Sequence, residues 1–85
     1  MIQVEEHRYV QEHGVLGFRF DTGEVLFYGP GVVPGTDVLD TRFIYSKGFK
    51  DRAEYLMAQK IVRGYAQDLG FQTVQGLFDY LRGVI

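Results

Sequence analysis

The chain of 85 residues contains no cysteine, a single serine, two histidines and two prolines. The lack of cysteine excludes disulfides, thiolate nucleophiles and cysteine-ligated metals, and it is compatible with a reducing cytosol, so we expect a cytoplasmic protein. No apolar run approaches the ~20 residues that a membrane-spanning helix needs. We do not expect the first ten residues, MIQVEEHRYV, to act as a signal peptide, because charged residues precede any apolar run. We therefore expect no membrane partner.

An excess of one charge is also absent, since the formal net charge is −2. A dedicated nucleic-acid-binding domain usually carries a clear basic excess, so a role of that kind would need a local basic patch. The apolar content of 46% is sufficient for a hydrophobic core and argues against disorder. The length corresponds to one domain spanning residues 1–85.

Residues that commonly carry catalysis are scarce. His7 and His13 lie six positions apart, a spacing that does not favour a shared metal site. Ser46 has no histidine nearby in the sequence, and the glycine-rich segment 29–35 is not followed by Gly-Lys-Ser/Thr or by a predicted helix, both of which a phosphate-binding loop needs. We therefore predict a protein that is not an enzyme, with no catalytic residue, no cofactor and no metal.

Residues 51–69, with the sequence DRAEYLMAQKIVRGYAQDL, predict one long helix. Asp51 and Glu54 have the spacing of a capping box, and Gly70 follows where helices commonly end on a left-handed glycine. At about 100° per residue the apolar side chains form a broad face, which we expect to be buried. That face comprises Ala53, Met57, Ala58, Ile61, Val62, Tyr65 and Leu69. The narrow stripe left to solvent comprises Arg52, Gln59, Lys60, Arg63 and Gln67.

Two β-branched and aromatic runs, residues 15–20 and 24–28, flank the sequence Asp21-Thr22-Gly23. This pattern predicts a β-hairpin whose three-residue loop has Gly23 in the left-handed conformation. The loop length also sets the strand register, and therefore the face on which each side chain lies. The core side is predicted to carry Leu16, Phe18, Phe20, Leu26 and Tyr28, and the opposite side Gly17, Arg19, Val25 and Phe27.

Residues 2–11 are predicted to form a strand, with a short helix ending at Gly14 as the alternative. If the connection 12–14 has the same three-residue geometry as the hairpin loop, Tyr9 lies beside Gly17 and helps to cover its bare backbone. The sheet face opposite the core then displays His7, Tyr9, Arg19, Val25 and Phe27.

The remaining segments complete the predicted fold. Residues 29–40 are expected to form a loop because two prolines and three glycines exclude a central strand, and residues 41–47 are predicted to form a further strand. Thr73 is placed to cap a second helix, although a short strand over 71–74 is an alternative. The apolar stripe of that helix comprises Val74, Leu77, Phe78 and Leu81. Strands followed by helices predict an α+β fold, in which a β-meander of three to four antiparallel strands is followed by two helices packed on one face.

Two surfaces are the predicted contact sites, namely the open sheet face and the basic stripe of the long helix. Uncovered aromatic patches are typical of interaction sites, and a basic stripe can meet an acidic protein surface or phosphates. We expect a protein-binding module that acts as a small regulator or inhibitor, a physical type to which phage-encoded and mobile-element inhibitors belong. A nucleic-acid-binding module that uses the same surfaces is the alternative function, and a small enzyme ranks third. The two surfaces could also be a homodimer interface or ordinary solvated protein surface. The candidate contact residues are Tyr9, Arg19, Phe27, Arg52, Lys60 and Arg63.

Overall fold

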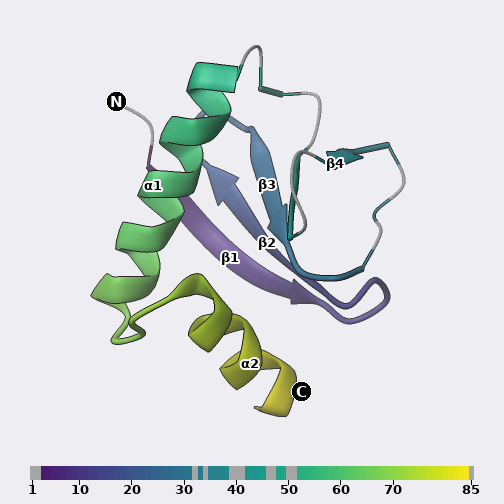
Figure 1. Cartoon of the computed structure of the whole chain (residues 1–85), viewed down its shortest axis with the longest axis vertical. Coiled ribbons are helices and arrows are strands. Elements are labelled where there is room, and N and C mark those ends of the chain that lie inside the picture. Colours follow the sequence, from purple (N-terminus) through teal and green to yellow (C-terminus); the bar gives the residue numbers. More distant parts are fainter. Residues whose placement is uncertain are drawn as a thin grey trace.

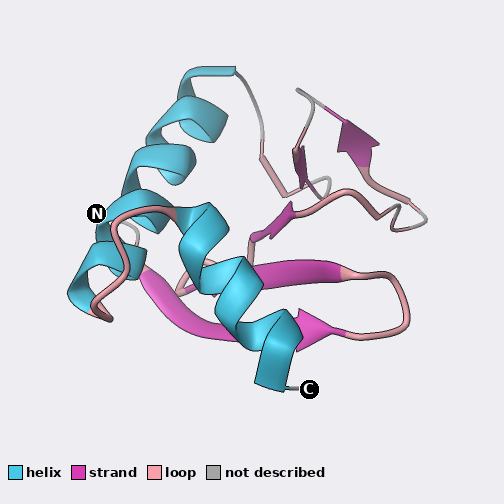
Figure 2. Ribbon diagram, turned by 60° about the horizontal axis from the view of Figure 1, so that its bottom comes forward, coloured by secondary structure: helices cyan, strands magenta, loops and turns pink. Residues whose placement is uncertain are grey.

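A computed structural model shows an antiparallel sheet with two helices packed against one of its faces (Figure 1; Figure 2). The structure describes residues 3–31, 33, 35–38, 42–45, 48–49 and 52–84. The strands are β1 (Val4–Val10), β2 (Val15–Phe20), β3 (Val25–Tyr28), β4 (Asp37–Val38) and β5 (Phe43–Tyr45), and the helices are α1 (Arg52–Asp68) and α2 (Val74–Val84). The spatial order of the strands is β1-β2-β3-β5-β4. The predicted α+β class, with strands followed by two helices, is confirmed.

The strand β4 lies within the segment that was predicted to be a loop. Asp37 pairs with Tyr45, and Val38 pairs with Ile44 of β5. The sheet therefore contains the four predicted strands and one additional edge strand, and the loop prediction for residues 29–40 is wrong at these two positions. A strand of two residues is too short to show the alternation by which strands are detected in a sequence.

The hairpin of β2 and β3 has the predicted register. Leu16 lies opposite Tyr28 and Phe18 opposite Leu26. Gly23 has a φ of 90°, and its N–H donates to the Phe20 carbonyl at 2.9 Å. A residue with a Cβ atom rarely adopts such a φ, so Gly23 sets the loop geometry and thereby the register.

The pairing of β1 with β2 differs from the prediction because the turn between them is one residue longer. Val10 lies opposite Val15, so the turn comprises residues 11–14 and not 12–14. Gly14 has the expected positive φ, at 67°. The extra turn residue shifts the part of β1 from Glu6 to Val10 by one position, and a shift of one position moves each of these side chains to the other face.

As a result, Tyr9 lies opposite Leu16 and not beside Gly17. The place beside Gly17 is occupied by Arg8. The same shift puts His7 on the face covered by the helices, where its ring packs edge-on against Tyr65 of α1 at a centroid distance of 5.5 Å. The prediction that His7 and Tyr9 lie on the open face is wrong.

The helix α1 forms where expected, but its buried face is rotated by about one residue, or about 100°. Gln59 is only 6% exposed, although it was assigned to the solvent stripe. Met57, by contrast, is 56% exposed and Leu69 is 45% exposed, so both are wrongly assigned to the buried face. Ala53 is also exposed, while Ile61 and Tyr65 are half-buried. The residues that α1 buries are Tyr55, Ala58, Gln59, Val62 and Ala66.

The rotation of α1 has a steric basis. Ala58 and Ala66 are fully buried, and small side chains allow a helix axis to approach a sheet closely. Tyr55, at the start of the helix, packs against the ring of Tyr45 in β5 at a centroid distance of 6.0 Å. The apolar arc of this helix is so broad that hydropathy alone does not locate its centre.

The two helices are joined by a short, well-defined connection. Gly70 has a φ of 97°, its N–H donates to the Gln67 carbonyl at 2.9 Å, and the Phe71 N–H donates to the Ala66 carbonyl at 3.0 Å. This is a Schellman motif, as the glycine predicted. Thr73 Oγ1 then accepts the Gly76 N–H at 3.0 Å and caps α2, which confirms the second helix over the alternative strand. The predicted cap at Asp51 lies outside the described residues.

The hydrophobic core lies between the sheet and both helices. Leu16, Phe18, Leu26 and Leu77 are buried as predicted, whereas the half-buried Ile61 contradicts the prediction that it is nearly fully buried. On the α2 side the core is completed by Val74, Leu77 and Phe78. Among the described residues no helix is long and apolar enough to cross a membrane.

The core assignment predicts the effect of truncating Leu16, which lies between Tyr9 and Tyr28 on the sheet. Leu16→Ala should lower the free energy of unfolding by about 2–5 kcal/mol, because it leaves a cavity that rigid aromatic neighbours cannot close. Urea denaturation measures this change. Ile61→Ala is the matched control and should cost clearly less, because Ile61 is only half-buried. Equal losses for the two variants would contradict this description of the core.

Candidate binding surfaces

The solvent-facing side of α1 combines cations with large apolar side chains. Arg52, Lys60 and Arg63 are exposed, as predicted, and among the described residues none of them forms an ion pair. Leu56 and Met57 lie among them and are 43% and 56% exposed. We call these five residues the α1 outer face.

The α1 outer face is continuous along the helix. Lys60 follows Met57 by three positions and Leu56 by four, so it is a surface neighbour of both. Arg63 follows Lys60 by three positions and lies one further turn along the same side. The apolar members of this surface escaped the sequence analysis, because Met57 was assigned to the core and Leu56 to neither face. In the sequence, these exposed apolar residues were indicated only by the breadth of the apolar arc, which left the centre of the buried face undefined.

The open sheet face contains a hollow of about 190 Å³ that is lined in part by Gly17. The ring of Phe27 lies against this glycine so closely that a Cβ atom there would be 3.1 Å from Cε1 of Phe27. Phe27, which lies opposite Gly17 in the neighbouring strand, therefore covers the bare backbone of this glycine. The other residues that line the hollow are Glu6, Arg8, Val10, Arg19 and Val25.

The charges of the open sheet face balance one another. Arg19 forms exposed ion pairs with Glu5 at 3.5 Å and Glu6 at 3.4 Å. A register shift between Val4 and Glu6 brings both carboxylates within reach of this one guanidinium. With Arg8 included, two positive charges face two negative ones, so the face offers no excess of cations. Exposed pairs of this kind add little to stability.

Tyr9 does not belong to either candidate surface. Its ring packs against Phe78 of α2 at a centroid distance of 5.7 Å, on the face covered by the helices. Arg19 and Phe27 remain together on the open face, and Arg52, Lys60 and Arg63 remain together on α1. Because α1 packs on the other side of the sheet, the predicted contact residues form two separate surfaces.

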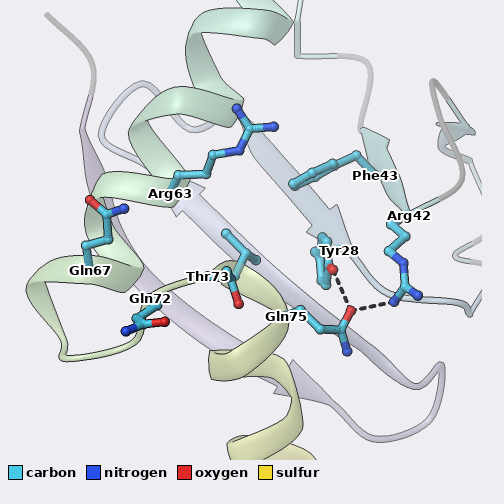
Figure 3. Close-up of a pocket in the computed structure, with 9 residues that line it drawn as sticks. Tyr28, Arg42, Phe43, Arg63, Gln67, Gln72, Thr73 and Gln75 are labelled. Atoms are coloured by element: carbon cyan, nitrogen blue, oxygen red, sulfur yellow. Dashed lines mark hydrogen bonds between the residues drawn. The ribbon is translucent and has the colours of Figure 1, made fainter.

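A third feature is a pocket between α1, the start of α2 and the strands β3 and β5 (Figure 3). Its volume is about 510 Å³. Gln75 Oε1 accepts a hydrogen bond from the Tyr28 hydroxyl at 2.6 Å and another from Arg42, so these side chains hold one another in place. The lining residues are Tyr28, Arg42, Phe43, Arg63, Gln67, Gln72, Thr73, Val74 and Gln75. Apart from Arg63, no candidate contact residue lines this pocket, because it joins segments that are distant in the sequence.

The part of the chain that the structure describes forms no group of side chains suited to a metal ion. No three His, Asp or Glu side chains gather there in a group that could hold a metal ion. The protein-family models, curated proteins and solved structures with which the chain was compared give no match. Function must therefore be inferred from the chemistry of the three surfaces.

One partly buried polar contact links the sheet to α1. The Tyr65 hydroxyl lies 2.6 Å from His7 Nδ1, and burial raises the pKa of Tyr65 above its ordinary value of 10.0. As pH rises, the unfolded chain therefore loses this phenolic proton before the folded chain does. The stability that the neutral phenol contributes is complete below about pH 10 and is lost as pH rises through the folded-state pKa.

Tyr65→Phe tests this contact. Near neutral pH the variant should be less stable than the wild type by about 0.5–1.5 kcal/mol, because the hydrogen bond to His7 is lost. Between about pH 9 and about pH 11 the wild type should lose stability more steeply than the variant, which has no phenol at this position to ionise. Urea denaturation of both proteins across this range measures the difference. Parallel pH profiles would contradict the assignment.

Proposed function

We propose that this protein is a non-enzymatic protein-binding module, a small regulator or inhibitor, whose α1 outer face covers an acidic surface of a partner protein. The observation that carries the proposal is the half exposure of Leu56 and Met57 among three cations that form no ion pair with the described residues. Large apolar side chains that stay in contact with water at neighbouring positions are typical of interaction sites.

The composition of this face indicates the chemistry of the partner. Methionine adapts to irregular apolar surfaces, so Met57 and Leu56 together fit an apolar depression. Arg52, Lys60 and Arg63 surround them, and rim charges of one sign favour a partner whose rim carries the opposite sign. We therefore infer an apolar depression bordered by Asp and Glu side chains on the partner.

The open sheet face is the second contact candidate. Phe27 is half-buried over Gly17, and Arg19 is already paired with two carboxylates. These residues therefore offer less exposed apolar area and fewer unpaired charges to a partner than the α1 outer face does.

The absence of cysteine supports our placement of the protein in the cytoplasm, where its partner would also lie.

Nucleic-acid binding is the second candidate function, and the three cations of α1 are the observation that favours it. Phosphates would replace solvent around Arg52, Lys60 and Arg63 without any deep pocket. Two features make it the weaker candidate, namely the net charge of −2 and the exposed Leu56 and Met57, for which phosphates offer no apolar contact.

Capture from a lysate of the source organism, treated with nuclease, tests the primary proposal. Met57→Asp should abolish capture of the protein partner, because it places a charge at the centre of the α1 outer face. Val84→Asp is the matched control, since Val84 is also an exposed apolar residue, at 62%, but lies at the end of α2. This variant should capture the partner as the wild type does. A partner that Met57→Asp still binds would contradict the proposal.

Salt dependence separates the two functions. Three phosphate contacts predict that log affinity for DNA falls against log salt with a slope of roughly −2 to −3, and that Lys60→Ala flattens this slope by about one unit. For a protein partner, Met57→Ala should instead cost on the order of 2 kcal/mol of binding free energy with little change in slope. Gel shifts of arbitrary duplex and single-stranded DNA at low micromolar protein in ~150 mM salt show whether the protein binds nucleic acid. Binding under those conditions would replace the primary proposal with the second.

A further inference from the structure

The chain contains very few sulfur atoms that a peroxide can oxidise. Cysteine and methionine are the side chains that undergo stepwise oxidation at sulfur, and the sequence has no cysteine and two methionines. Met1 lies outside the described residues. Met57 lies in α1 and is 56% exposed, so a dissolved peroxide has direct access to it.

Met57 occupies a position where a change of polarity alters the surface and not the core. The core that the described residues form does not include it. The opposite side of α1 holds the helix on the sheet through buried residues such as Tyr55, Ala58 and Val62. An oxygen atom added to the Met57 sulfur therefore lies in solvent and leaves the packing of the helix in place.

The expected reaction is the transfer of one oxygen atom from hydrogen peroxide to the thioether. A lone pair of Met57 Sδ attacks one peroxide oxygen, an S–O bond forms and the O–O bond breaks. The sulfur is oxidised by two electrons and the peroxide is reduced. The proton of the transferred hydroxyl group passes to the leaving oxygen, which departs as water. The product is methionine sulfoxide, which methionine sulfoxide reductases convert back to the thioether. In that reduction two thiols supply the electrons and become a disulfide, and the oxygen again leaves as water.

The sulfoxide changes the centre of the α1 outer face from apolar to polar. A partner would have to bury the sulfoxide oxygen, which costs free energy unless a hydrogen-bond donor is supplied. Lys60 is exposed and follows Met57 by three positions, so its ammonium group is a surface neighbour that can donate to this oxygen. An ammonium group held by the sulfoxide is less available to a carboxylate of the partner. Both effects oppose binding.

We propose that Met57 is a site of reversible oxidation by peroxides, and that its sulfoxide weakens the contact between the α1 outer face and the partner protein. The weakening rests on the proposed protein-binding function. The oxidation itself rests only on the composition of the chain and on the exposure of Met57. The consequence is a binding module that releases its partner under oxidising conditions without using a cysteine.

Peptide mass spectrometry of the native protein after treatment with hydrogen peroxide tests the modification. Met57 should gain one oxygen atom at a rate close to that of the urea-unfolded chain, because the fold does not shield an exposed side chain. A methionine sulfoxide reductase should then remove this oxygen. Oxidation in the folded protein that is slower than in the unfolded chain by more than roughly tenfold would overturn the site.

Two measurements without a partner show what the modification does. Urea denaturation should give the same free energy of unfolding before and after oxidation, whereas retention on a phenyl column in ammonium sulfate should fall. Met57→Leu is the matched control, because leucine is apolar and has no sulfur while Met1 is kept. Peroxide should leave the retention of this variant at its value before treatment. An equal fall in Met57→Leu would assign the effect to Met1 and overturn the proposal.

The partner that the reduced wild type captures is then used, in purified form, to measure the regulation. The protein is oxidised separately and freed of peroxide before mixing. Oxidised wild type should bind this partner at least about tenfold more weakly than reduced wild type, and treatment with the reductase should restore the affinity. Peroxide should not change the affinity of Met57→Leu, whatever its starting value.

The outcomes separate a failure of this inference from a failure of the proposed function. Oxidised wild type that binds the partner as tightly as the reduced protein would overturn the regulation and leave the proposed function intact. Reduced wild type that captures no partner would contradict the proposed function and, with it, the regulation. The mass and column measurements decide the oxidation of Met57 in either case.

Discussion

The register between β2 and β3 is the constraint on which the remaining structure depends. It places Leu16, Phe18 and Leu26 on one face of the sheet, where they are fully buried. A small domain has few large side chains to bury, so both helices must pack against this same face. The register itself depends on a three-residue loop with Gly23 in the left-handed conformation, which makes a local turn responsible for a global arrangement.

Packing on a single face also decides which surfaces remain for binding. The other face of the sheet has a hollow at Gly17, where Arg19 is paired with Glu5 and Glu6. The outer side of α1 stays in water with Leu56 and Met57 exposed. The Schellman turn at Gly70 reverses the chain so that the first turn of α2 faces Arg63 across a pocket. Two turns, at Gly23 and Gly70, thus generate three chemically different surfaces.

Local patterns in the sequence were sufficient for much of the fold. The hairpin, the end of α1 and the cap of α2 were predicted because each depends on residues within a few positions, at Gly23, Gly70 and Thr73. The register of β1 was wrong by one position because it depends on whether Gln11 belongs to the strand or to the turn. Both choices leave a plausible alternation of side chains, so the sequence contains no strong preference between them.

The candidate sites also differ in how far the sequence alone could predict them. Arg52, Lys60 and Arg63 were recognisable as a solvent-facing basic stripe, because helical periodicity alone groups them. The exposure of Met57 and the removal of Tyr9 from the open sheet face required the tertiary structure, since helix rotation and strand register are set by packing against distant residues. The pocket required it most of all: Arg42, Arg63 and Gln75 come from three separate segments. Residue order determines local geometry through short-range hydrogen bonds and sterics, whereas only the packed core determines which distant side chains meet.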